Sequence, residues 1–147
     1  MKTLWDRPTY DEVVQRIGRL TAGSRPRWGR MSCPQMVVHV TDALGLYTGE
    51  LSAPVKRTPL QYAPFKQVLV YVLPMPRNVP TAPELLARVP DDWDDEIARL
   101  HQALAAFAAQ HARSDWPLHP LFGRLSCRAY GVLAYKHTDH HLRQFGV

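Results

Sequence analysis

The stretch WDDEIARLHQALAAFAAQH, residues 93–111, has the clearest helical pattern in the chain. Its apolar and ring-bearing residues recur alternately four and three positions apart, which is the spacing of a packed seam in a helical bundle. They are Trp93, Ile97, Leu100, Leu104, Phe107 and His111. Aspartates at the start of the stretch favour a helix N-terminus because they interact with the helix dipole. We therefore predict a helix over residues 93–111 that packs against other helices.

Two segments upstream carry capping signals for further helices. Thr9 with Glu12 predicts a capping box, and apolar residues at helical spacing follow it to residue 20. Ser32 with Gln35 predicts a second capping box, followed by an apolar face that extends to Tyr47. The sequence thus predicts two helices before residue 50.

The remaining helices are expected further along the chain. Ser126 predicts the N-cap of a last helix that runs to about Phe145. Residues 65–73 would also suit a strand, but no other segment offers a strand partner, so we predict a helix there. A capping signal predicts a short helix over residues 83–89.

The segments between these helices are rich in proline. Residues 51–64 are long enough for a crossover connection, and residues 114–123 form a second loop. Four long amphipathic helices joined in this way predict an all-α protein, an antiparallel four-helix bundle with a long crossover loop. A length of 147 residues is typical of one domain, so we expect a single domain over residues 1–147.

Composition narrows the class of protein. Two cysteines, Cys33 and Cys127, are too few for a disulfide framework. The first residues lack the apolar run of a signal peptide, and no apolar stretch approaches the ~20 residues of a membrane span. We therefore expect a cytoplasmic protein with no membrane partner. Because Cys33 lies at an expected helix N-terminus, a lowered thiol pKa is expected for it.

The net charge of +5 is scattered along the chain. The densest basic cluster, Arg25, Arg27 and Arg30, falls in an expected loop, which is more typical of solvated surface than of a nucleic-acid-binding patch. Nucleic acid is therefore a disfavoured partner. The positive charge suits an anionic small-molecule substrate better.

The segment YKHTDHH, residues 135–141, contains the most informative spacing in the sequence. His137 and His141 are four residues apart and therefore share one face of the last helix. On a helical wheel this face coincides with the apolar stripe, so both imidazoles are expected to point into the bundle, with His140 at the margin. Buried histidines are costly unless they are hydrogen-bonded or ligated, and the pair alone is compatible with either.

A third ligand is expected from a facing helix. His39 flanks the apolar stripe of the second predicted helix, although a lone histidine there is more typically a hydrogen-bonded core residue. Three neutral imidazoles leave a coordination position open, as in catalytic sites, whereas structural zinc sites usually have four protein ligands. His39, His137 and His141 are thus the candidate metal ligands. Zinc and nickel are the favoured ions, with iron as a further candidate.

Three other side chains are candidates for the surrounding pocket. His140 is a candidate to orient a ligand or to shuttle a proton. Tyr130 lies two turns from His137 on the same helical face and is a candidate to line the pocket. His119, in an expected loop, is a candidate to contact a substrate or to support a metal ligand.

Four phrases of the sequence resemble one subgroup of the DinB-like superfamily of four-helix-bundle metalloproteins. They are WGRMS at 28–32, QMVVH at 35–39, HPLFG at 119–123 and HTDHHLRQFG at 137–146. The resemblance implies a bundle with up-down-down-up connectivity and a metal held by His39, His137 and His141. Characterised relatives include metal-dependent transferases that use a low-molecular-weight thiol and a thiol-dependent isomerase. Many relatives form homodimers, so the resemblance also implies a homodimer.

The leading functional hypothesis is a metal-dependent enzyme acting on a small molecule. A divalent ion would lower the pKa of a bound water or of a cofactor thiol, which suits hydrolysis and thiol transfer equally well. The alternative is a non-catalytic, metal-binding stress-response bundle whose ion fixes the helix packing.

Overall fold

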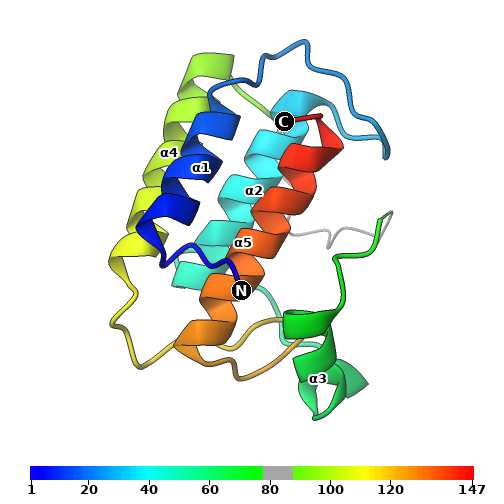
Figure 1. The fold of residues 1–147 in the computed structure, drawn as a ribbon, viewed down its shortest axis with the longest axis vertical. Helices are drawn as coiled ribbons and strands as arrows, with labels where there is room; N and C mark the ends of the chain where they lie inside the picture. The colour runs from blue at the N-terminus through cyan, green and yellow to red at the C-terminus, as the bar shows by residue number, and fades with distance from the viewer. Residues whose placement is uncertain (78–87) are drawn as a thin grey trace.

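The computed structural model describes residues 1–77 and 88–147, and all of its regular elements are helical (Figure 1). The long helices are α1 (Arg7–Ile17), α2 (Cys33–Thr48), α4 (Trp93–Ala109) and α5 (Cys127–Gln144). A 3₁₀ turn, η1 (Pro59–Gln61), and a short helix, α3 (Phe65–Gln67), lie between α2 and α4, and α3 continues as a π-helix, η2 (Val68–Val72). Over the described residues there is no strand, which confirms the predicted all-α class.

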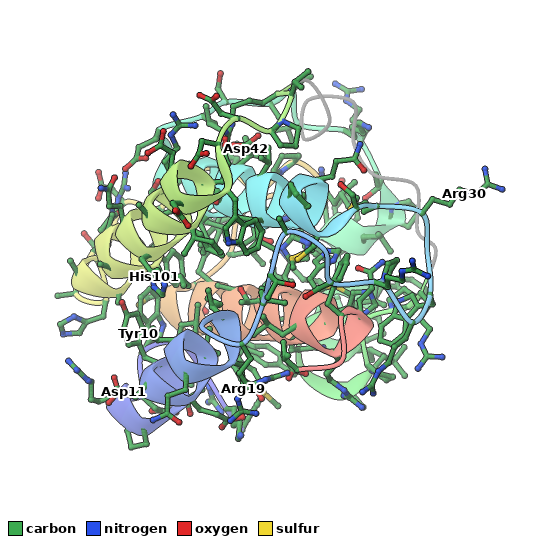
Figure 2. All side chains as sticks on the ribbon, turned by 90° about the horizontal axis from the view of Figure 1, so that it is seen from above. Tyr10, Asp11, Arg19, Arg30, Asp42 and His101 are labelled. Atoms are coloured by element: carbon green, nitrogen blue, oxygen red, sulfur yellow. The ribbon has the colours of Figure 1, made fainter. Side chains whose placement is uncertain are left out.

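The four long helices lie side by side (Figure 1). In that view α1 and α5 run upwards along the chain, whereas α2 and α4 run downwards. Helix α2 packs against both α4 and α5, and α1 packs against α5. Seen from above, side chains fill the space between these helices, and Arg30 extends away from it on the loop before α2 (Figure 2). That loop is solvated around Arg30, as the sequence predicted.

The helix starts agree with the predicted caps at two of three positions. Ser32 accepts a hydrogen bond from the Gln35 amide, and the Gln35 side chain accepts one from the Ser32 amide, so the predicted capping box is confirmed. Ser126 caps α5, also as predicted. The capping box predicted at Thr9 is wrong, because α1 begins at Arg7. Pro8 lies in the first turn, where its fixed φ angle favours a helix that begins ahead of Thr9.

The segment predicted as helix at residues 65–73 is helical, but its hydrogen-bond pattern changes after three residues. The α-helical turn of α3 gives way to the wider π-helix η2. Lys136 of α5 donates from Nζ to the carbonyl oxygens of Leu69, Val70 and Leu73, at 2.6–2.9 Å. The ammonium thus satisfies carbonyl groups at the end of η2 and attaches this segment to α5.

Two further predictions concern the flanks of α4. This helix ends at Ala109, two residues before the predicted end. Residues 83–87 of the short helix predicted over 83–89 lie outside the described residues, and Arg88 and Val89 are not helical. None of the helices in residues 1–77 and 88–147 is long and apolar enough to cross a membrane.

The apolar seam predicted on α4 forms part of the core. Leu100, Leu104 and Phe107 are buried, and the indole of Trp5 stacks on Phe107 with ring centroids 4.5 Å apart. Trp5 also lies directly on Gly131 of α5, where an added Cβ would meet the indole nitrogen at 2.1 Å. Glycine at position 131 is therefore what allows the N-terminal segment to lie against α5.

Candidate metal centre

Three imidazoles from two helices converge at one point in the interior. His39 is on α2, and His137 and His141 are on successive turns of α5. The Nε2 atom of His137 lies 3.0 Å from Nε2 of His39 and 3.2 Å from Nε2 of His141. One ligand atom from each of the three residues lies within 4.8 Å of the other two. Since α2 packs directly against α5, two spatially adjacent helices supply the whole cluster.

The ring orientations explain how the nitrogen atoms meet. The three pairs of ring centroids are 4.7–4.9 Å apart, and the ring planes cross at 73–83°. Rings in this arrangement meet through their edges and do not stack. His39 and His141 are 5% and 8% exposed, and His137 is partly exposed. The cluster is therefore largely buried, and His137 is its least buried residue.

The geometry fits a divalent transition-metal ion. Zinc–nitrogen bonds of about 2.0–2.1 Å in a tetrahedral site place neighbouring ligand nitrogens roughly 3.3 Å apart. The two Nε2–Nε2 separations of 3.0 and 3.2 Å lie close to that value. Three imidazoles and no thiolate also suit nickel, copper or iron. Three protein ligands leave at least one coordination position for a water or a substrate.

Burial keeps two of the candidate ligands, His137 and His141, in the form that binds metal. Burial, followed by the nearby His39 imidazole, lowers the pKa of His141 to about 3. Burial also holds the pKa of His137 well below its ordinary value, reinforced by His141 and His39. Both imidazoles are therefore neutral at pH 7, and a neutral imidazole offers a nitrogen lone pair to a cation.

Gln144 contacts the centre and was given no role by sequence reasoning. Its Oε1 lies 2.8 Å from Nδ1 of His141, and its Nε2 donates to the backbone oxygen of Trp28 at 2.8 Å. The sequence did contain a signal for this contact, because Gln144 is a polar residue about one turn after His141, at the edge of the apolar stripe that faces inward. The partner Trp28 lies 116 positions away in the sequence, so helical periodicity gives no indication of it.

His140 lies beside the three imidazoles and not among them. Its ring meets that of His141 edge-on, with centroids 5.2 Å apart, and it also contacts the ring of Trp28. It lines a cleft of about 370 Å³ together with the basic side chains of Arg77, Lys136 and Arg143. Burial is the main cause of its lowered pKa. The His140 ring thus lies at the margin of the cluster, as predicted. Its role in orienting a ligand or shuttling a proton stays a prediction.

The two remaining pocket candidates are both buried. The hydroxyl of Tyr130 donates to the Pro117 carbonyl, and its ring stacks on Trp116. His119 accepts hydrogen bonds at Nδ1 from the backbone amides of Leu121 and Phe122, and burial lowers its pKa to about 4. The contacts of Tyr130 are those of a core residue. A pocket role for either side chain stays a prediction.

His119 is separated from the imidazole cluster by one aromatic ring. That ring belongs to Tyr47, whose centroid lies 5.6 Å from that of His119 and 6.4 Å from that of His137. The loop at residues 119–123 therefore approaches the same part of the interior as the cluster.

The cysteines are not part of the centre. The expectation of a lowered thiol pKa at Cys33 is wrong, because burial raises it to about 11 and outweighs the effect of the helix terminus. The Cys127 thiol donates to the His111 carbonyl, and burial raises its pKa as well. Both cysteines are free of disulfide bonds.

Fold and centre together define the class: an all-helical protein with a buried histidine triad whose geometry could hold a metal ion. Comparison with family models places the chain further. It belongs to the family DUF1569, described as a protein of unknown function, whose model matches residues 6–146. No curated protein and no solved structure gave a match.

Proposed function

We propose that this protein binds one divalent transition-metal ion through His39, His137 and His141. The observation that carries the proposal is the convergence of three Nε2 atoms at 3.0 and 3.2 Å in an interior that keeps His137 and His141 neutral. Like-charged imidazolium rings at these distances would repel, so the neutral forms are compatible with the fold and are also the ligand forms.

We further propose that the chain is a DinB-like metalloprotein. Two features support this: the order of helix directions in Figure 1, and the placement of one histidine on the second long helix and an H-x-x-x-H pair on the last. The same class includes dimeric members, and we extend the proposal to a homodimer.

The function we infer is that of a metal-dependent enzyme acting on a small molecule. A divalent cation supplies Lewis-acid chemistry that activates a water or a thiol, which suits hydrolysis or transfer of a low-molecular-weight thiol. The cleft beside His140 supports this inference, because it lies next to the centre and two of its lining side chains, Arg77 and Arg143, are guanidinium groups against the one carboxylate of Asp139. This balance of charge suits an anionic substrate.

The first experiment is metal analysis of untagged protein prepared without chelators. We expect close to one ion per chain after loading with zinc or nickel, and loss of that ion in His39→Ala, His137→Ala and His141→Ala. His101→Ala on α4 is the matched control, since it removes a histidine that is not in the cluster, and it should keep the ion. Wild-type protein that stays empty after loading with zinc, nickel and iron would overturn the proposal.

A second experiment separates the enzyme from the alternative of a non-catalytic bundle. That alternative has a specific observation in its favour, because a metal at the triad would join α2 to α5. A chain of this length buries enough surface to fold without a metal, so we expect metal-free protein to keep its helical circular dichroism. Loaded protein should hydrolyse nitrophenyl acetate or transfer cysteine to chlorodinitrobenzene, and His137→Ala should not. Unfolding on metal removal, without either activity, would favour the non-catalytic role.

A further inference from the structure

Gln144 is a buried polar residue whose amide oxygen and amide nitrogen each have a hydrogen-bond partner. Its side chain lies near the C-terminal end of α5 and the residue is only 5% exposed. The amide contacts His141 through Oε1 and the backbone of Trp28 through Nε2. Its backbone oxygen also accepts a hydrogen bond from the Arg27 amide at 2.7 Å. One residue therefore links the loop before α2 to a histidine of the candidate centre.

The Trp28 contact determines which way the Gln144 amide faces. A backbone carbonyl only accepts hydrogen bonds, so the group that faces Trp28 must be the amide nitrogen. Oε1 then faces His141, and it can only accept. The proton on the neutral His141 ring is consequently on Nδ1, and Nε2 has the free lone pair.

That lone pair points to where the three imidazoles converge. Nε2 of His141 is the atom 3.2 Å from Nε2 of His137. We propose that Gln144 is a positioning residue for the metal centre, which fixes the tautomer and the ring orientation of His141 so that Nε2 is the ligand atom. The inference rests on the proposed metal binding. A hydrogen-bond acceptor on the second nitrogen of a histidine ligand is a general means of setting both properties.

In the loop that contacts Gln144, position 29 has no space for a Cβ atom. A Cβ added to Gly29 would lie 2.5 Å from Nε2 of Gln144, the atom that donates to Trp28. Gly29 also has a φ angle of +81°, which L-residues rarely adopt. The loop thus determines the position of the amide, although none of its residues is a candidate ligand.

The first test reads the tautomer directly in metal-free protein. Long-range ¹⁵N NMR at pH 7.5 should show a proton on Nδ1 of His141 in wild type, and a mixture of tautomers in Gln144→Met. Methionine keeps the length of the side chain and removes the acceptor. Gln144→Glu loses the donor to the Trp28 carbonyl but keeps an acceptor for His141, so it should retain the Nδ1 proton. A single Nδ1–H tautomer in Gln144→Met would overturn the inference.

The second test is zinc affinity, measured by competition with a chelating dye. Loss of such a supporting hydrogen bond weakens metal binding by roughly 10–100-fold, which we expect for Gln144→Met, with recovery towards the wild-type value in Gln144→Glu. Gly29→Ala should weaken binding in the same direction because it displaces the amide. Gly49→Ala is its control, since Gly49 has a similar φ of +87° but its Cβ would meet only Pro117, at 3.7 Å.

The outcomes distinguish the two proposals. If wild type and Gln144→Met bind zinc equally tightly, the positioning role of Gln144 is overturned and the proposal of metal binding stands. Wild type that binds no zinc overturns the metal proposal itself. Equal weakening in Gly29→Ala and Gly49→Ala would assign the effect to backbone strain and contradict the positioning role.

Discussion

The two halves of α5 face the interior with different chemistry. Near its N-terminal end, Tyr130 and Gly131 pack against the large rings of Trp116 and Trp5. Near its C-terminal end, Leu142 is also buried, but His137, His141 and Gln144 bring nitrogen and oxygen atoms to hydrogen-bonding distances from one another and from His39. The first half is stabilised by close packing and apolar burial, whereas the second depends on the positions of its polar atoms and on the protonation states of its histidines. Each half should therefore respond to a different perturbation.

The largest effect on stability is expected among the aromatic rings around the first half of α5, which include Phe107 of α4. Phe107 is fully buried and stacks on Trp5, so Phe107→Ala should lower the free energy of unfolding by about 3–5 kcal/mol. Urea unfolding checks this value. The zinc affinity of the folded fraction should stay within a few-fold of wild type. A zinc affinity that falls as far as in His141→Ala would show that the two halves are not independent.

Zinc binding should act on the histidine half. Its effect on the free energy of unfolding should be somewhat smaller than that of Phe107→Ala. Free zinc at 100 times its dissociation constant should raise the free energy of unfolding of wild type by about 2.7 kcal/mol. Phe107→Ala should gain the same increment from a lower baseline, because its centre is unchanged. His141→Ala should gain far less, and an equal gain in that variant would mean that zinc binds elsewhere on the chain.

A substitution on α5 itself should disturb only the aromatic half. Gly131→Ala places a methyl group 2.1 Å from the Trp5 indole nitrogen and displaces the hydrogen bond from that nitrogen to the Cys127 carbonyl. We expect a loss of about 1–3 kcal/mol, measured by thermal or urea unfolding. Gly23→Ala is the control, because an added Cβ there meets nothing within 4 Å. Similar losses in both variants would contradict the role assigned to close packing on Trp5.

In the histidine half, acid should act through His141, and gradually. The pKa of His141 is about 3 in the fold, against about 6.5 for an unperturbed histidine, so the unfolded chain binds more protons between these values. Metal-free protein should therefore lose stability as the pH falls from about 6.5 towards 3, by up to about 1.4 kcal/mol per pH unit for this residue. His141→Ala should show a shallower slope than wild type, whereas Phe107→Ala should keep the wild-type slope. Equal slopes in wild type and His141→Ala would contradict this account.

Prediction from the sequence was most successful for the C-terminal half of α5, which contains two histidines of the cluster. Helical periodicity places His137 and His141 on one inward face, because a spacing of four is a local property of a helix. The prediction that His39 approaches them from the second helix is also confirmed. It depended on the apolar stripe beside His39, which indicated the side of α2 that faces inward.

Properties that depend on tertiary contacts were not predictable in the same way. One error was local: the start of α1 follows Pro8 in the first turn and not the capping signal at Thr9. The thiol of Cys33 was expected to respond to its helix terminus, but its burial dominates. The bond from Gln144 to Trp28 joins residues distant in the chain, so only the folded structure reveals it.

Lys136, next to His137 in sequence, has a consequence for chemical reactivity. Three backbone carbonyls of the η2 segment lie within 2.6–2.9 Å of its ammonium group, which uses all three of its hydrogen-bond donors. An acylating reagent can reach this amine only after those bonds open, so Lys136 should be labelled more slowly than the more exposed Lys56. The labelling rate of a single lysine therefore measures how often residues 68–73 detach from α5.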